Sequence, residues 1–170
     1  MHSVEWYKEK YGENDLTHKS KERVKKHGEV FTPAWLVARM CDMLDEESGG
    51  QAFELGKTFI EPCCGTGNFA VEIVGRLLEK CKTPEDVRTA VSSYYTVEIQ
   101  ADNVGECRAR VAKLVAGKWP DVDVTDILER NIVQGDFLHP QGIWFLEEYA
   151  ETFEMEQQKY KKRKRKEKQP

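Results

Sequence analysis

The residues best able to do chemistry gather around one short stretch of the sequence. Glu61 ends an extended-type run at 58–60, and Pro62 and two glycines follow it. From Phe69 the apolar residues recur at three-and-four spacing, which predicts a helix. A strand that turns on glycines into a helix N-terminus brings backbone N–H groups close to a ligand. The stretch therefore predicts a small-molecule site, with a purely structural turn as the alternative.

Charge separates two kinds of ligand for this turn. Gly65, Gly67 and Ala70 fit the G-x-G-x-x-G/A spacing of dinucleotide-binding turns. A pyrophosphate would be repelled by Glu61, whereas a ligand with an ammonium and a sulfonium would be attracted to it. The strand-end acid Glu98 follows Gly67 by 31 residues, whereas a dinucleotide site places its acid about 20 residues on. The residues thus favour S-adenosylmethionine over NAD, and an NAD-linked Rossmann protein is the competing hypothesis.

Two further strands are predicted downstream. Residues 94–97 form a β-type run that ends at Glu98, where a carboxylate is placed to accept hydrogen bonds from ribose hydroxyls. An ordinary exposed glutamate is the alternative. Residues 131–137 read as a third strand running into a turn at Gly135-Asp136, which in isolation is a turn signal only.

Together these stretches resemble the motifs of N6-adenine DNA methyltransferases of restriction–modification systems. Residues 61–69 are similar to motif I, usually Asp-Pro-Ala-Cys-Gly-Thr-Gly followed by a small residue and Phe. Glu61 for Asp and Cys63 for Ala are mild departures. Phe31-Thr32-Pro33 resembles motif X, and the acids at 98 and 136 occupy the places of motifs II and III.

The resemblance implies an α/β, Rossmann-like fold and a cofactor pocket. In the family, motif X packs over the methionine end of S-adenosylmethionine. The motif II acid binds the ribose, the apolar residue after it packs on the adenine, and the motif III Asp accepts a bond from the adenine amino group. The cofactor-binding residues implied here are Phe31, Thr32, Pro33, Glu61, Cys63, Cys64, Gly65, Thr66, Gly67, Asn68, Phe69, Glu98, Ile99, Asp136 and Phe137.

The catalytic part of the family pattern is missing. Motif IV, Asn/Asp-Pro-Pro-Tyr/Phe, holds the target adenine amino group, yet no two of the six prolines are adjacent. No catalytic residue is therefore predicted. We expect only the first half of the sheet, from a split or truncated enzyme whose other half, or a specificity subunit, is a second polypeptide. A SAM-binding module without methyl transfer is the alternative.

A missing half would also leave an open strand edge. The family sheet has the order 3-2-1-4-5, so the motif I strand would lack the strand normally beside it, and open edges are prone to association. Three candidates could cover it: Ile143-Trp144-Phe145, a partner chain or a second copy.

Three regions are expected along the chain. Residues 1–27 form a polar, basic arm or solvated helix, 28–140 the cofactor domain, and 141–170 a charged terminal helix with a basic tail. The segment 159–168 contributes +7 to the net charge of −4, so the rest carries −11. DNA contact by the basic stretches is a hypothesis only. In the cofactor domain, Thr32 should cap a helix that buries its apolar positions, Leu36, Met40, Met43 and Leu44.

Other classes of protein are disfavoured by composition. The chain lacks an apolar run of membrane-spanning length and an apolar segment near Met1, which predicts a cytoplasmic protein. Five cysteines without a C-x-x-C pair and four scattered histidines predict no metal site.

Overall fold

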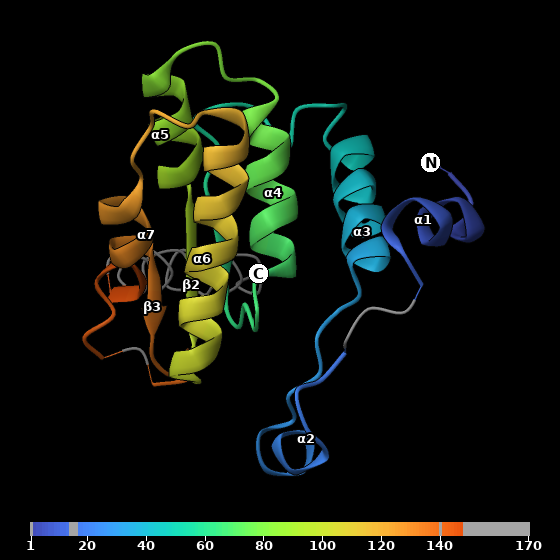
Figure 1. The fold of residues 1–170 in the computed structure, drawn as a ribbon, viewed down its shortest axis with the longest axis vertical. Coiled ribbons are helices and arrows are strands. Elements are labelled where there is room, and N and C mark those ends of the chain that lie inside the picture. The colour runs from blue at the N-terminus through green and yellow to red at the C-terminus, as the bar shows by residue number, and fades with distance from the viewer. Residues whose placement is uncertain (1, 14–16, 140, 148–170) are drawn as a thin grey trace, which may run out of the picture.

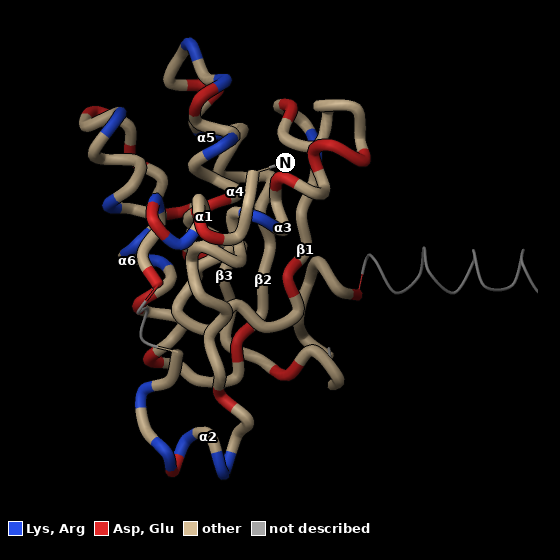
Figure 2. The backbone as a smooth tube through the Cα atoms, turned by 90° about the vertical axis from the view of Figure 1, so that its right-hand side faces the viewer, with Lys and Arg blue, Asp and Glu red and all other residues tan. Residues whose placement is uncertain are grey.

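Three short parallel strands form the sheet, in the order β1-β2-β3 (Figure 2). Strands β2 and β3 are also labelled in Figure 1. The computed structural model describes residues 2–13, 17–139 and 141–147. The strands are β1 (Phe59–Glu61), β2 (Tyr94–Glu98) and β3 (Ile132–Gln134). The predicted mixed α/β fold with a small parallel sheet is confirmed at this level.

Seven helices accompany the sheet in the described part of the chain. They are α1 (Val4–Tyr11), α2 (Lys21–His27), α3 (Ala34–Glu47), α4 (Asn68–Leu78), α5 (Pro84–Ser92), α6 (Ala101–Lys118) and α7 (Thr125–Asn131). The helix expected after the glycine turn is present as α4. The short α7, which precedes β3, was not predicted.

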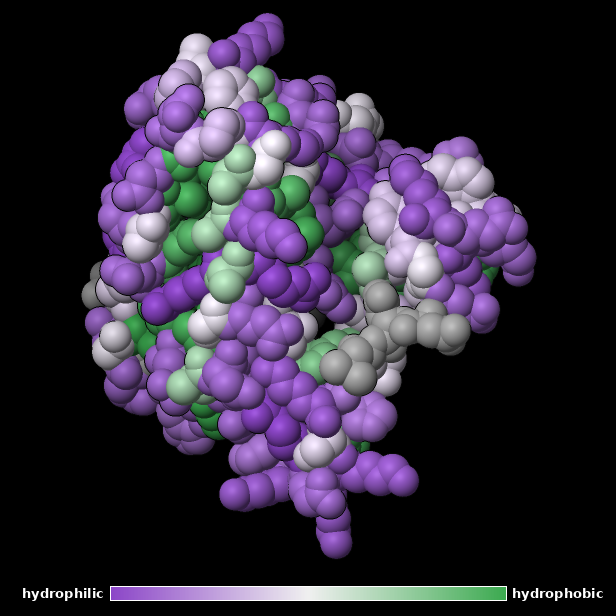
Figure 3. Space-filling view, in the orientation of Figure 1, coloured by the Kyte–Doolittle hydropathy of each residue, from purple (hydrophilic) through white to green (hydrophobic). Residues whose placement is uncertain are grey.

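One face of the sheet carries the main apolar core. Phe59, Tyr94 and Ile132 lie on this face and pack with α4, α5, α6 and α7. Phe59 is paired with Tyr94, and Ile132 is paired with Thr96, which points to the same face as Tyr94. Figure 3, which views the molecule from the helical side, shows a mostly hydrophilic surface with apolar residues visible in the furrows between helices. Burial of the apolar stripes is what holds these helices on the sheet.

The opposite face is covered by the chain that follows β3. Residues 144–147 are helical, and Ile143, Phe145 and Leu146 pack against Val97 of β2. Trp144 fixes this segment by donating from its indole N–H to the Arg130 carbonyl at 3.1 Å. The expected charged helix at 141–170 is thus seen only at its start, since residues 148–170 lie outside the described part.

Helix α3 differs from its prediction in two ways. It begins at Ala34 with Pro33 as the N-cap and no side-chain cap, so Thr32 does not cap it. The residues it buries are Val37, Ala38 and Cys41, whereas Met40, Met43 and Leu44 are 42–46% exposed. Leu36 is half-buried. Both stripes of this helix are apolar, and the prediction chose the more exposed one.

The N-terminal segment is more structured than a solvated arm. Tyr7 of α1 is fully buried and its hydroxyl donates to Asp42 of α3. Helix α2 is anchored through Arg23, whereas Lys21, Lys25 and Lys26 are exposed. Among the described residues, no helix has the length and apolar character needed to cross a membrane.

Candidate cofactor-binding site

A cavity of about 180 Å³ lies at the carboxyl ends of β1 and β2. Its floor is the turn between β1 and α4, and its far wall is the start of α6. The third side is the segment 27–32, here called the strap, which crosses in front of the turn. Parallel α/β sheets usually bind ligands at this end, outside the carboxyl ends of their strands.

The two glycines of the turn adopt conformations that favour glycine. Gly65 has φ +51°, and a Cβ there would lie 2.8 Å from the Phe31 ring. Gly67 has φ +88° and would place a Cβ 2.6 Å from the Cys107 sulfur. The turn therefore requires both glycines, one so that the strap can pack against it and one so that α4 can pack against α6.

Glu61 brings a carboxylate to the cavity from the end of β1. Burial, reinforced by the charge of Glu98, raises the pKa of Glu61 to about 7, although the Tyr94 hydroxyl donates a hydrogen bond to it. Within the described residues Glu61 has no basic ion-pair partner. A partly buried carboxylate with no cation beside it is a ready partner for a cationic ligand.

Glu98 lies at the end of β2 with its side chain almost fully buried. One carboxylate oxygen accepts from the Gly65 backbone N–H at 2.9 Å and from the Cys63 thiol at 3.4 Å. The other oxygen accepts from the Gln100 backbone N–H at 2.9 Å. The Glu98 carboxylate thus ties the glycine turn to the start of α6, and it also lines the cavity.

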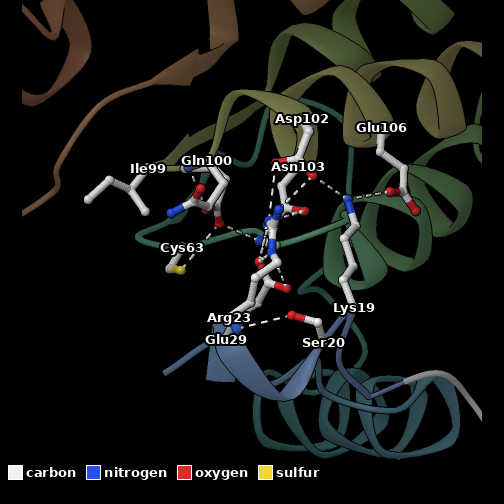
Figure 4. Close-up of polar contacts among 12 residues, drawn as sticks. Lys19, Ser20, Arg23, Glu29, Cys63, Ile99, Gln100, Asp102, Asn103 and Glu106 are labelled. Carbon is white, nitrogen blue, oxygen red and sulfur yellow. Dashed lines mark hydrogen bonds and ion pairs between the residues drawn. The ribbon is translucent and has the colours of Figure 1, made fainter. Parts of the chain in front are cut away.

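The strap is held to helix α6 by an ion-pair network (Figure 4). Arg23 donates to Glu29 at 2.8 and 2.9 Å and to Asp102 of α6 at 2.9 Å. Asn103 donates to Glu29 at 3.0 Å, and Lys19 pairs with Asp102 at 3.0 Å. These cations lower the pKa of Asp102 to about 2. The base of the strap is therefore anchored to the helix that follows Glu98.

A second tether joins the strap to the glycine turn directly. The Asn68 side-chain amide donates to the Thr32 carbonyl at 2.7 Å. Phe31 is 7% exposed, and its backbone N–H donates to Thr17 at 2.7 Å. The two stretches compared with motifs X and I are thus in contact in space.

Most of the predicted site residues come together at this cavity. Those that line it are Phe31, Thr32, Glu61, Cys63, Cys64, Gly65, Thr66, Asn68, Phe69, Glu98 and Ile99. Pro33 and Gly67 adjoin lining residues in the chain without lining the cavity themselves.

Asp136 and Phe137 are not brought to this cavity. The Asp136 carboxylate accepts from the Leu138 backbone N–H at 2.9 Å and pairs with His139 at 2.7 Å, which lowers the pKa of Asp136. Phe137 packs with the apolar cluster around Val97. Both residues follow β3, which β2 separates from the turn after β1. Of the three acids assigned to the cofactor site from the sequence, Glu61 and Glu98 line this cavity and Asp136 does not.

Sequence reasoning missed the anchoring network and several wall residues. His27, Gly28, Glu29, Val30 and Gln100 also line the cavity. Glu29 lies two residues before Phe31, so its place next to the stretch that resembles motif X could have identified it as a site residue. Nothing in the sequence indicated that Arg23 meets Asp102, because 79 residues separate them.

The described residues hold no cluster of three or more His, Cys, Asp or Glu side chains arranged for a metal ion.

Comparison with known proteins gives one similarity. Over 113 residues, 66% of its length, the chain is 37% identical to the Type II methyltransferase M.VspI of Vibrio sp. (strain 343). The matched part is 21% of that relative, so the chain spans about a fifth of it. No family model matches the chain, and no solved structure matches it. The chain is thus a partial homologue of a methyltransferase, a class of enzyme that uses a SAM-type methyl donor.

Proposed function

We propose that the chain binds S-adenosylmethionine beneath the strap and forms the cofactor-binding part of an N6-adenine DNA methyltransferase of the restriction–modification type. The observation that carries the proposal is Glu61, a carboxylate beside the cavity whose pKa is raised to about 7 and which has no basic partner in the described residues. An ammonium group bound there would favour the ionised form and remove the cost of burying it.

The other walls fit the remaining parts of this ligand. The Glu98 oxygen that accepts from the Gln100 backbone N–H makes no other hydrogen bond and keeps a lone pair, which suits a ribose hydroxyl. Ile99 is 52% exposed beside it, so a flat apolar ring would cover it. Phe31 and Thr32 would close over the methionine end. Asp136 and Phe137 have no part in this arrangement unless the segment after β3 moves.

When bound, the cofactor supplies an activated methyl group, while this chain's residues bind and orient it. Holding an adenine amino group in line requires a second set of residues, because positioning provides much of the rate. The Asn/Asp-Pro-Pro-Tyr/Phe motif that does this in the family is absent from these 170 residues. We assign it to the other part of a split or truncated enzyme. The methyltransferase name of the partial relative supports the reaction class.

A titration and a transfer assay test the proposal in turn. We expect calorimetric binding of S-adenosylmethionine and none of NAD, and binding of NAD alone would overturn the assignment. Tritiated S-adenosylmethionine is then incubated with unmethylated DNA, with and without a polypeptide carrying Asn-Pro-Pro-Tyr. Transfer that depends on that polypeptide supports the enzyme.

A SAM-binding module without transfer is the second candidate, and the missing motif favours it. Binding of S-adenosylmethionine with no label in DNA under either condition would select this alternative.

A further inference from the structure

Helix α2 stands apart from the packed body of the molecule. Figures 1 and 2 both show it at the foot of the molecule, away from the other labelled helices. None of its seven residues is buried. A helix of this length is not stable by itself in water, and it gains nothing here from an apolar face. Its place therefore depends on a few polar contacts.

Those contacts join α2 to the strap and to α6. The Ser20 hydroxyl caps the helix by accepting from the Arg23 backbone N–H at 3.1 Å. The Arg23 guanidinium then reaches Glu29 of the strap at 2.8 Å and Asp102 of α6 at 2.9 Å. The helix ends at Gly28, which is left-handed with φ +65° and belongs to the strap itself. The position of α2 thus determines where the strap begins.

Three lysines of α2 carry positive charge without a partner. Lys21, Lys25 and Lys26, here called the lysine cluster, are exposed. Their side chains make no ion pair or hydrogen bond within the described residues. On α1, by contrast, Lys8 pairs with Glu13. Lys21 and Lys25 are one helical turn apart, so their side chains lie on the same side of α2.

Helix stability accounts for only part of this charge. Lys25 and Lys26 lie in the last turn of α2, where cations interact favourably with the helix dipole. Lys21 is the first residue of the helix, where a cation is disfavoured. The cluster as a whole therefore suits an anion from outside the chain better than it suits the helix.

The surroundings of the lysine cluster favour a polyanion. His27, the residue after Lys26, lines the cofactor cavity, so the cluster lies beside its mouth. Outside residues 159–168 the chain carries a net charge of −11, so the rest of this body repels a polyanion, which the cluster attracts. Lysine contacts to phosphates bind a nucleic-acid backbone and fix its position without reading its sequence.

We propose that the lysine cluster of α2 binds the phosphate backbone of DNA, and that this contact holds the strap closed over the cofactor. The step rests on the proposed function, which supplies DNA as the substrate. Because α2 runs directly into the strap through Gly28, a backbone that fixes α2 also favours the closed strap. Binding of S-adenosylmethionine then strengthens the DNA contact by the same factor, since such coupling is reciprocal.

A DNA titration tests the contact. The full 170-residue chain is titrated against a fluorescein-labelled, unmethylated duplex, and anisotropy is measured over a range of salt concentrations. In the test variant all three lysines of the cluster are replaced by alanine, a strong helix former that keeps α2 helical. We expect binding at least about tenfold weaker than for the control below, with the slope of log affinity against log salt reduced by about 2–3.

The control removes the same charge elsewhere. It replaces three exposed lysines outside α2, and it should bind DNA within about twofold of the parent chain. The control substitutions are Lys57→Ala, Lys82→Ala and Lys113→Ala. The basic segment 159–168 is present in every variant, so its own contribution cancels in the comparison.

Calorimetry tests the coupling to the cofactor. Saturating duplex should tighten binding of S-adenosylmethionine to the parent chain at least about fivefold. The variant without the lysine cluster should bind S-adenosylmethionine like the parent when DNA is absent, and should gain nothing when it is added. The control variant should respond to DNA as the parent does.

Each outcome decides the proposal. Equal DNA affinity in the test and control variants overturns it, and so does a cofactor affinity that DNA leaves unchanged in the parent chain. Duplex RNA of the same sequence is the competing polyanion, and preferential binding of RNA through the cluster would also overturn the assignment to DNA. Failure of the proposed function is distinguishable, because the parent would then bind no S-adenosylmethionine with or without DNA. Failure of this step alone leaves that binding intact.

Discussion

The carboxylate of Glu98 accepts a hydrogen bond from the backbone N–H of Gly65 at 2.9 Å. This bond links the end of β2 to the turn that follows β1, and the second oxygen holds the start of α6 through Gln100. One side chain therefore joins the turn after β1 to the start of α6, and both of these border the cavity.

Glu98→Gln tests this role. The amide keeps one acceptor oxygen, but its NH₂ group cannot accept from the other backbone N–H, which is left unpaired. We expect the free energy of unfolding to fall by about 1–3 kcal/mol. Urea denaturation measures the change, with the exposed Glu129→Gln as the control. Equal stability of Glu98→Gln and the parent would contradict the role.

Gly67→Ala tests the requirement for glycine in the turn. The added Cβ would lie 2.6 Å from the Cys107 sulfur at a φ of +88°, so we expect a loss of about 2–3 kcal/mol in the free energy of unfolding. Gly105→Ala in α6 is the control, because its Cβ would meet open space, and it should stabilise by about 0.5–1 kcal/mol. If Gly67→Ala leaves the free energy of unfolding unchanged, the turn does not require glycine at this position.

Arg23→Ala tests whether the strap must be anchored. Removing the guanidinium leaves the Glu29 side chain, 6% exposed, without its ion pair, so the closed strap becomes less populated. Because apparent affinity falls with the population of the competent state, we expect about tenfold weaker binding of S-adenosylmethionine. Lys25→Ala, an exposed residue of the same helix, should bind like the parent. Binding is measured by calorimetry. An unchanged affinity in Arg23→Ala would show that anchoring of the strap does not contribute to ligand binding.

Glu61→Gln tests the cost of the buried carboxylate. The pKa of Glu61 is raised from 4.5 to about 7, so between these values the folded state binds more protons than the unfolded state. Stability from this group is present below pH 4.5 and is lost as pH rises through 7. Glu61→Gln should therefore stabilise the chain by about 1–3 kcal/mol at pH 8 and much less at pH 5. Urea denaturation at both pH values measures this, and an equal effect at both would contradict the raised pKa.

Local patterns predicted the elements that depend on neighbours in sequence. The 58–69 stretch folds as strand, turn and helix, as its local pattern predicts. Contacts between elements that are far apart in the sequence could not be predicted from it. Helix α3 has two apolar stripes, and periodicity cannot tell which one meets α4. Asp136 was assigned to motif III from the order of the motifs in the sequence. Its distance from the cavity depends on the strand order, in which β2 lies between β1 and β3.

The site was predictable to the same extent. Glu61 and Glu98 each end a recognisable strand, and parallel strands bring their carboxyl ends to one edge. Arg23 lies in the basic arm predicted for residues 1–27, and charge alone does not distinguish a tethered arginine from the exposed Lys25. Ion pairs across the sequence depend on the completed fold.

The most direct measurement of the central claim is the pH dependence of S-adenosylmethionine binding to the 170-residue chain, compared with Glu61→Gln. If the ionised Glu61 carboxylate holds the ligand's ammonium, the affinity of the parent chain should be at least about tenfold weaker at pH 5.5 than at pH 7.5. Glu61→Gln should bind weakly at both. Tight binding that neither pH nor Glu61→Gln alters, or no binding of this ligand at all, would contradict the account.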